Sequence, residues 1–530
     1  MCYAAPSQTD SDRAEDMVEP TNVSPIASAI QFLRAFWLRI TALSIALLIP
    51  CLWHRRIAAG DLASHVYNAW LAQLIERGQA PGLYIVRRWN NVLVDLALLH
   101  LGNWFGLAAA EKLVVSLCVL IFFWGAFALV SAITRRAPWF LVPCLAMLTY
   151  GWTFNVGFFN YYVSVGFGFF AIAALWPWMF CEQSELANGQ SHPKLDAFTA
   201  IVLIVLAILV FVAHPQGFLW LVGCLAYLLA WMALRGRWKL AVPGAAIALI
   251  VGVRVYCAHH YESFSIWDSF GPGLYLGNDQ IALYHSRYLT LSTVATLFGL
   301  GCFVADGVRR YRQHEPWTHL RLPFELYCVL VFATYVLPDV LRLPLYAGWV
   351  GSFALRLTTI SAALGLCVLA FMKPRWWHFA GFAAVAAVFF TFLYRDTAVL
   401  NRMEQQIESL VSTLPPGERV TASIWAPPDS RLPYIVHMID RACVGKCFSF
   451  QNYEPASGEF RVHGQEDNPI VAIDPDDTQS MEAGEYVVRT EELPMAHIYQ
   501  CDEHDLTRLC IRQLAAREIN GRLGYHPPRQ

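Results

Sequence analysis

Residues 112–133 read KLVVSLCVLIFFWGAFALVSAI, and the basic pair Arg135 and Arg136 follows almost at once. An apolar run of about 18 residues or more is long enough to cross a bilayer as a helix. Ten further runs follow the same pattern, at about 36–53, 138–154, 158–180, 198–213, 216–234, 239–257, 288–306, 323–341, 350–372 and 376–394. The sequence therefore predicts an all-α polytopic membrane bundle of about eleven transmembrane helices.

The composition favours the same class. The chain has 530 residues, of which 56% are hydrophobic and 15% charged, whereas about a quarter of a soluble domain is charged. The net charge of -2 argues against nucleic acid as a partner. Residues 1–34 begin with an acidic, polar stretch and contain no cleavable signal peptide, so we expect a disordered cytoplasmic tail. Residues 35–394 form the predicted transmembrane domain.

The polar gaps between the runs alternate in charge. One set is basic: Arg135, Arg136, Arg235, Arg237, Lys239, Arg309, Arg310, Arg312, Lys373 and Arg375. The intervening set carries Asn155, Asn160, His214, His259, His260, Asp268, Asp279, His285 and Asp339. Because basic loops stay cytoplasmic, the second set is predicted to face the periplasm. We expect a multi-pass protein of the bacterial inner (plasma) membrane with a cytoplasmic N-terminus.

The first external loop, about 54–111, is long for a connection within a bundle. Apolar residues recur at helical spacing on both sides of Pro81 and Gly82, which predicts two amphipathic helices lying at the outer membrane interface. The loop departs from the charge pattern by carrying Arg55, Arg56, Arg87, Arg88 and Lys112. External arginine invites a negatively charged ligand.

An odd number of spans places the tail, residues 395–530, in the periplasm as a small α+β domain. We expect helices over 401–413 and 505–517, and strands over 419–424, 460–463, 486–489 and 497–500. The tail contains Cys443, Cys447, Cys501 and Cys510. Outside the cytoplasm these are disulfide candidates; a zinc site is the alternative, although the second pair is spaced too widely for a zinc ribbon.

Asp61 is the candidate catalytic residue. It lies just after the first span, where a carboxylate can take a proton from an acceptor hydroxyl or hold a divalent metal such as Mg or Mn. His65 is four residues further on, on the same helical face. The alternative is that Asp61 only caps a helix, and the two roles are compatible.

Candidate substrate-binding residues follow. Arg87 and Arg88 are suited to clamp a phosphate in a forked geometry, or they only snorkel to headgroups. Asn91 and Asp95 share a helical face beside them. Charges inside spans are costly and usually functional, which singles out Arg254 and Arg356. His214 interrupts two spans, as a site residue or as a helix cap. Asn155, Asn160, Tyr161 and Tyr162 are interpreted as an interfacial belt, the alternative being that the asparagines hydrogen-bond a sugar on which the rings stack.

No nucleotide-binding motif is present in the chain, and its cytoplasmic loops are short. A transferred group would therefore arrive already activated on a lipid or another external donor. This observation favours membrane-linked chemistry over nucleotide-dependent chemistry.

With Gly60 and Asp61 after the first span, two helices in the first external loop and a C-terminal domain, the chain resembles the GT-C superfamily of integral-membrane glycosyltransferases. The resemblance implies a polyprenyl-phosphate or polyprenyl-diphosphate sugar donor, and it implies that Asp61 is the essential acidic residue. Some family members use a metal and others do not, and this loop has no Asp-x-Asp pair.

We therefore expect a glycosyltransferase that moves a sugar from a polyprenyl-linked donor to an acceptor on the periplasmic face, with membrane lipid as its surroundings. One alternative is a transporter or flippase for lipid-linked sugars, although no internal repeat is evident. Another is a non-catalytic membrane scaffold whose external domain binds a partner. The sequence does not name the sugar, the acceptor or the metal.

Overall fold

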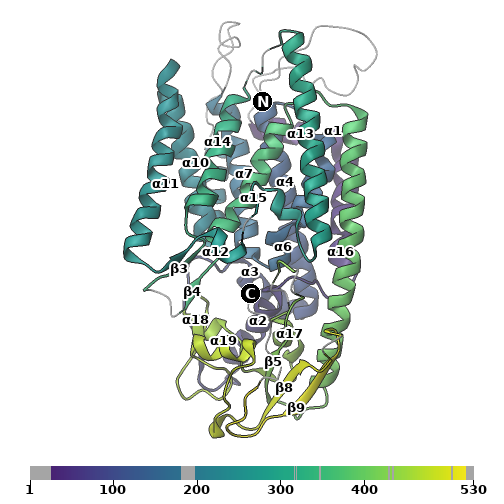
Figure 1. The fold of residues 1–530 in the computed structure, drawn as a ribbon, viewed down its shortest axis with the longest axis vertical. Helices are drawn as coiled ribbons and strands as arrows, with labels where there is room; N and C mark the ends of the chain where they lie inside the picture. The colour runs from purple at the N-terminus through teal and green to yellow at the C-terminus, as the bar shows by residue number, and fades with distance from the viewer. Residues whose placement is uncertain are drawn as a thin grey trace.

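A computed structural model describes residues 25–180 and 197–520, apart from residues 272, 316, 318, 345–347, 428–429, 433–434 and 503–504. The predicted tail therefore lies mostly outside the described residues, and its last part belongs to the first helix, which begins at Pro25. The structure is 66% helix and 7% strand. Helices form a bundle, and a smaller α+β region covers one end of it (Figure 1).

The prediction of a helical bundle is confirmed. The helices of the bundle are α1 (Pro25–Leu52), α4 (Leu107–Thr134), α5 (Val142–Thr149), α6 (Trp152–Val156), α7 (Phe159–Met179), α9 (Ala197–Ala213), α10 (Pro215–Ala233), α11 (Ala241–His260), α13 (Ser286–Arg312), α14 (Arg321–Val336), α15 (Phe353–Leu369) and α16 (Trp376–Val411). Short 3₁₀ turns η1 (Trp139–Leu141), η2 (Gly236–Leu240) and η3 (Asn278–Ile281) and helix α12 (Ile266–Phe270) lie between them.

Within the described residues, eight helical segments are long and apolar enough to cross a membrane, judged by length and composition. Three predicted spans, 198–213, 323–341 and 350–372, correspond instead to the shorter helices α9, α14 and α15. The chain therefore has the character of a membrane protein, and the count of eleven spans stays a prediction. The bundle is closely packed at its centre, where a Cβ on Gly125 of α4 would lie 2.4 Å from the carbonyl oxygen of Gly166 of α7.

The basic segments between the apolar runs lie together at one end of the bundle. Arg136 donates to the carbonyl oxygens of Ala370 and Met372, and Arg310 donates to that of Phe371 at 2.9 Å. This end is remote from the α+β region (Figure 1). These basic segments therefore gather at one end of the bundle, although the other end also carries arginines such as Arg88 and Arg356.

The first external loop contains the two expected helices, α2 (Leu62–Glu76) and α3 (Leu93–Phe105), joined through strand β1 (Leu83–Ile85). Their expected interfacial position is wrong for α2, which is buried on almost every face because it lies between the bundle and the α+β region. Helix α3 fits the expectation better, since Trp104 at its end is 74% exposed.

The C-terminal unit (residues 412–520) follows α16, which runs on from the bundle and contains the predicted helix 401–413 as far as Val411. Its sheet has the order β6-β5-β8-β9, from β5 (Arg419–Ser423), β6 (Phe448–Ser449), β8 (Met495–Gln500) and β9 (Leu509–Gln513). Strand β7 (Val462–Gly464) pairs instead with β1 of the first loop. Helices α17 (Met438–Cys443), α18 (Glu454–Ser457) and α19 (Pro475–Ala483) and the turn η4 (Thr490–Glu492) complete the unit.

Two elements of the tail were predicted wrongly. Residues 505–517 contain strand β9 rather than a closing helix, because Leu509 to Gln513 pair with β8. Residues 486–489 form only an isolated bridge through Val487. The four tail cysteines form the disulfides Cys443–Cys447 and Cys501–Cys510, so the disulfide alternative holds over zinc.

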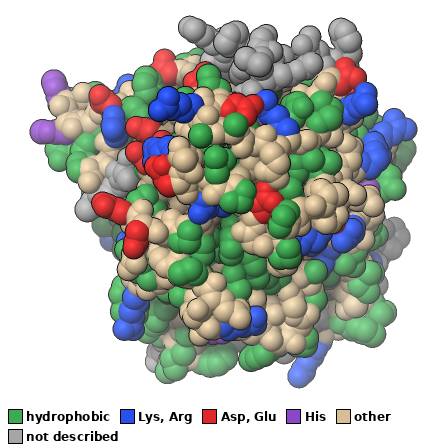
Figure 2. Space-filling view, turned by 90° about the horizontal axis from the view of Figure 1, so that it is seen from below, with side chains coloured by type: hydrophobic (Ala, Val, Ile, Leu, Met, Phe, Trp, Pro, Cys, Tyr) green, Lys and Arg blue, Asp and Glu red, His purple; other side chains and the backbone are tan. Residues whose placement is uncertain are grey.

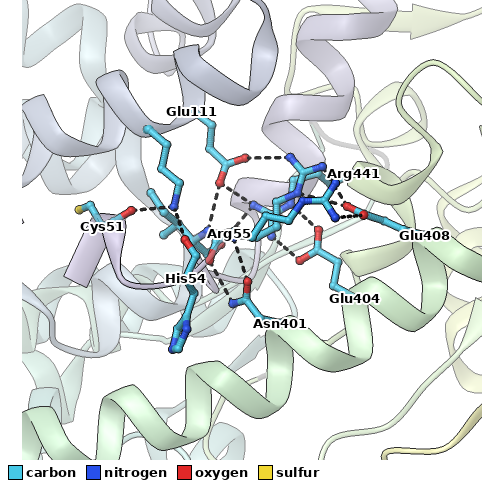
Figure 3. Close-up of polar contacts among 11 residues, drawn as sticks. Cys51, His54, Arg55, Glu111, Asn401, Glu404, Glu408 and Arg441 are labelled. Carbon is cyan, nitrogen blue, oxygen red and sulfur yellow. Dashed lines mark hydrogen bonds and ion pairs between the residues drawn. The ribbon is translucent and has the colours of Figure 1, made fainter. Parts of the chain in front are cut away.

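Ion pairs join the C-terminal unit to the bundle (Figure 3). The side chain of Arg441 is buried and bonds to Glu404 of α16 at 2.6 Å and to Glu111 of α4 at 2.9 Å. We call this group the buried charge cluster; its members are Arg55, Arg56, Glu111, Lys112, Glu404, Glu408 and Arg441.

Three cations of this cluster lie in or next to the first external loop: Arg55 and Arg56 follow α1, and Lys112 is on α4. Arg55 and Arg56 pair with Glu408, while Lys112 donates to the carbonyl oxygens of Cys51 and His54 at 2.7 and 3.0 Å. The expectation that these three residues invite an anionic ligand is therefore wrong, because they hold the protein's own groups.

Candidate functional site

A cavity of about 620 Å³ lies between the bundle and the C-terminal unit. It gathers six of the nine predicted site residues, which come from distant parts of the sequence: Asp61, His65, Arg88, Asn91, His214 and Arg356. Acidic, imidazole and guanidinium groups thus meet at one cavity in the structure.

Asp61 is held by its backbone. The amide groups of Gly60 and Asp61 donate to the carbonyl oxygens of Asn155 and Val156 at 2.9 and 2.8 Å. The contact requires glycine at position 157, whose φ is +97° and whose added Cβ would lie 2.6 Å from the Asp61 nitrogen.

The side chain of Asp61 faces the cavity. Asp61 occupies the N-cap position of α2, but its carboxylate makes no capping hydrogen bond. The side chain keeps 22% of its surface exposed. The helix-cap interpretation therefore describes the position of the residue in the chain and leaves its carboxylate available for chemistry.

His65 is part of a buried group behind the cavity wall. Its Nδ1 lies 2.7 Å from Asp95 and 3.5 Å from Glu454 of α18. Burial alone would lower the pKa of His65, but the charge and hydrogen bond of Asp95 outweigh it and raise that pKa to about 10. Asn160 fixes Asp95 by donating to it at 2.9 Å. His65 is thus a charged link between the first loop and the C-terminal unit.

Glu454 completes this group as a neutral acid. Burial raises its pKa to about 8, although the neighbouring imidazolium of His65 favours the charged form. Asp95 itself lies behind the cavity lining, so its role is to orient His65.

Arg356 presents a cation without a matching carboxylate contact among the described residues. Its guanidinium lies 3.9 Å above the ring of Phe158, and no described acceptor bonds to its buried Nε. Tyr161 anchors the helix by donating to the Arg356 carbonyl at 2.8 Å. A half-buried cation of this kind, which lines the cavity, is suited to bind an anionic ligand.

His214 is both a cap and a lining residue. Its Nδ1 accepts from the backbone amide of Gln216 at 3.1 Å, which confirms the helix-cap interpretation. Its ring packs edge-on against Tyr161, with 5.3 Å between the ring centroids. The imidazole therefore shapes the cavity wall beside Arg356.

The neighbouring arginines Arg87 and Arg88 behave differently. Arg88 lines the cavity and donates to the backbone carbonyls of Gly458 and Phe460. Arg87 is exposed, stacks on Trp89 at 4.2 Å and lies outside the cavity. Consecutive side chains of an extended segment point to opposite sides, so a paired clamp is not formed.

Arg254 is a second correction. It bonds to Ser263 at 3.1 Å and does not line the cavity. Because it lies near the outer end of its helix, it reaches the following loop instead of the centre of the protein.

The sequence interpretation missed the residues that the C-terminal unit contributes. Among these are His437, Tyr453, Glu459 and Glu482. Asn160 and Tyr161, which were interpreted as part of an interfacial belt, also line the cavity. Only the position of Asn160 and Tyr161 on the predicted periplasmic side hinted at the site. Nothing in the sequence connects His437 with Asp61.

His437 lies between two carboxylates. Its Nε2 is 3.7 Å from Asp61, and its Nδ1 is 3.5 Å from Asp440. Burial would lower the pKa of His437, but Asp440, helped by Glu482 and Asp61, raises it to about 9. Burial also raises the pKa of Glu482 to about 7. The cavity therefore holds groups that can donate and accept protons near neutral pH.

The sequence left a divalent metal open. Within the described ranges, no three His, Cys, Asp or Glu side chains are arranged to hold a metal ion. Asp61 lies near His437 rather than beside a second carboxylate ligand. The arrangement itself offers acid–base and anion-binding chemistry.

No family model, curated protein or solved structure matches this chain. Function is therefore argued from the chemistry of the cavity.

Proposed function

We propose that this protein is a membrane glycosyltransferase. It transfers a sugar from a polyprenyl-phosphate or polyprenyl-diphosphate donor to an acceptor on the periplasmic face of the bacterial inner membrane. The observation that carries the proposal is that Asp61, Arg88 and Arg356 line the same cavity. A carboxylate and two guanidiniums are the groups that a sugar transfer with a phosphate leaving group requires.

The proposed reaction uses each of these groups once. Asp61 takes the proton of an acceptor hydroxyl, and the oxygen of that hydroxyl bonds to the anomeric carbon of the sugar. The bond between that carbon and the phosphate oxygen breaks, and the electron pair leaves with the phosphate. Arg88 and Arg356 balance the negative charge that develops on the leaving phosphate.

Aromatic side chains beside the cavity are suited to a lipid-linked donor. Trp349 of strand β4 (Trp349–Val350) lines the cavity and is 42% exposed. Phe264 of β2 (Ser263–Phe264) packs beside it, with 5.3 Å between the ring centroids. Exposed aromatic side chains at a membrane protein's cavity edge are suited to contact a polyprenyl chain.

The experiment uses the full chain in proteoliposomes with polyprenyl-phosphate-linked sugars and a panel of acceptors. Mass spectrometry follows both the glycosylated product and the released polyprenyl phosphate. We expect Asp61→Asn to lower the rate by about 10²–10⁴-fold, because the base is removed while the size of the side chain is kept.

The matched control is Asp505→Asn, which changes an exposed aspartate of the C-terminal unit outside the cavity. It should keep the wild-type rate. Transfer that continues unchanged in Asp61→Asn would reject the proposed base. Movement of the lipid-linked sugar across the vesicle without a covalent product would favour a flippase instead.

A further inference from the structure

One carboxylate of the cavity has no partner within the protein. Glu459 lies between α18 and β7 and lines the cavity together with Arg88 and Arg356. It is half-buried, and its carboxylate makes no hydrogen bond or ion pair with the residues that the structure describes. A carboxylate offers two acceptor oxygens, and leaving them without donors in a partly buried place is costly. Glu459 is therefore suited to accept hydrogen bonds from a ligand.

The backbone around Glu459 is held in place. Arg88 donates to the carbonyl oxygens of Gly458 and Phe460, the residues on either side. The amide of Glu459 itself donates to Ser457 Oγ at 3.2 Å. Shortly after Phe460, strand β7 pairs with β1 of the first loop. The cavity wall thus presents this side chain from a segment that is fixed on both sides.

Glu459 belongs to the same part of the cavity as the two arginines. Arg88 contacts the backbone on both sides of it, and the charges of Arg356 and Arg88 act on its carboxylate. Burial raises the pKa of Glu459, and these two cations oppose the rise. A phosphate group bound by the arginines would therefore lie beside Glu459.

A sugar joined to that phosphate brings hydroxyl groups to this place, because its anomeric carbon is bonded directly to a phosphate oxygen. Hydroxyl groups donate hydrogen bonds, and hydrogen bonds to a carboxylate are among the strong ones. A phosphate without a sugar offers negative charge and acceptor oxygens, which a carboxylate repels. One side chain can thus favour the sugar-bearing lipid and disfavour the bare lipid phosphate.

We propose that Glu459 is a specificity-determining residue that accepts a hydrogen bond from a hydroxyl group of the sugar on the polyprenyl-phosphate donor. The inference rests on the proposed function, which makes a lipid-linked sugar the ligand of the cavity. Before transfer, the arginines hold the phosphate and Glu459 holds the sugar. After transfer, the polyprenyl phosphate meets the Glu459 carboxylate without a hydroxyl group between them, which favours its release.

The test measures binding and requires no transfer. Microscale thermophoresis of the full-length protein in lipid nanodiscs gives dissociation constants for polyprenyl phosphate and for polyprenyl phosphates that carry glucose, galactose, mannose or N-acetylglucosamine. The sugar preference is the dissociation constant of the bare lipid phosphate divided by the lowest value among the sugar-bearing lipids. We compare the wild type with Glu459→Ala and Glu459→Gln. The matched control is Glu485→Gln, which changes an exposed glutamate of the same unit outside the cavity.

We expect the sugar preference to fall by about tenfold in Glu459→Ala, because a charge-assisted hydrogen bond is lost. It should fall by less in Glu459→Gln, which keeps an uncharged acceptor. Bare polyprenyl phosphate should bind at least as tightly to both variants as to the wild type, because a carboxylate has been removed from beside two arginines. Glu485→Gln should keep all the wild-type constants. A residue that only supports the fold would weaken both kinds of lipid alike and leave their ratio unchanged.

An unchanged sugar preference in folded Glu459→Ala would overturn the inference, and so would a wild type that binds no sugar-bearing lipid more tightly than the bare phosphate. If the alanine variant does not fold, an unchanged preference in Glu459→Gln decides against the inference instead. Failure of the proposed function is a different result: the wild type prefers a sugar-bearing lipid but releases no glycosylated product from it.

Discussion

The buried charge cluster and the cavity lie along the same seam between the bundle and the C-terminal unit, and both are built from arginine and carboxylate. In the cluster, Arg441 is enclosed by Glu111, Glu404 and a backbone carbonyl. In the cavity, Arg356 lies over an aromatic ring, and its Nε has no described acceptor. The difference teaches that Arg441 is satisfied by the protein's own carboxylates, whereas Arg356 keeps a donor available to a ligand.

The largest effect should come from opening the cluster. Arg441→Met leaves two buried carboxylates without their shared cation, so we expect the free energy of unfolding to fall by about 3–5 kcal/mol. The measurement is thermal unfolding of the detergent-solubilised protein.

The control is Arg508→Met, which removes an exposed arginine from a surface pair with Asp502 at 3.8 Å. It should change the stability by less than about 1 kcal/mol. Equal melting temperatures for both variants would show that Arg441 does not join the C-terminal unit to the bundle.

A smaller and different effect should come from the cavity arginine. Arg356→Gln should keep the melting temperature near the wild-type value but weaken binding of polyprenyl phosphate by about 10–100-fold, because one charge-assisted contact to phosphate is lost. Arg87→Gln is the matched control, since Arg87 is exposed and lies outside the cavity. Identical affinities for the two variants would contradict the assignment of Arg356 as the phosphate-binding cation.

The third prediction concerns Glu454, the buried acid beside His65. The pKa of Glu454 is raised from 4.5 to about 8 by burial, so its neutral form stabilises the folded state. That contribution is complete below about pH 4.5 and is lost as the pH rises through about 8. Glu454→Gln should therefore flatten the decline of melting temperature between these two values.

The control for this prediction is Glu466→Gln, a change at an exposed glutamate of the same unit. It should leave the pH dependence of the melting temperature as in the wild type. A wild-type decline retained between pH 4.5 and 6.5 in Glu454→Gln would contradict this role, because the raised pKa of His65 lowers stability only from about 6.5 to about 10.

Much of the candidate site could be predicted because its residues occupy one class of gap. Asp61 and Asn91 were found in the predicted external loop, His214 at the break between two runs and Arg356 inside a run, and the cavity contains all four. Arg87, in the same loop, and Arg254, inside another run, point elsewhere. Position along a run restricts a side chain to one end of the bundle, but it does not set the direction in which that side chain points.

Figure 2 looks onto the end of the molecule that carries the C-terminal unit, where acidic and basic side chains are interspersed with apolar ones. Strand β9 shows a related limit: the segment 505–517 was predicted to be helical, but pairing with β8 decided its conformation. Local preference is weaker than the hydrogen bonds that a neighbouring strand supplies.

The sequence by itself determined where the apolar helices lie, because the free energy of moving side chains out of water depends on the composition of each run. It also determined which of the segments between the runs are basic. Only the tertiary structure decided that His437, Tyr453 and Glu482 meet Asp61. These contacts join the first external loop to the C-terminal unit, and their energy depends on distance and burial, which arise only when the two regions pack together.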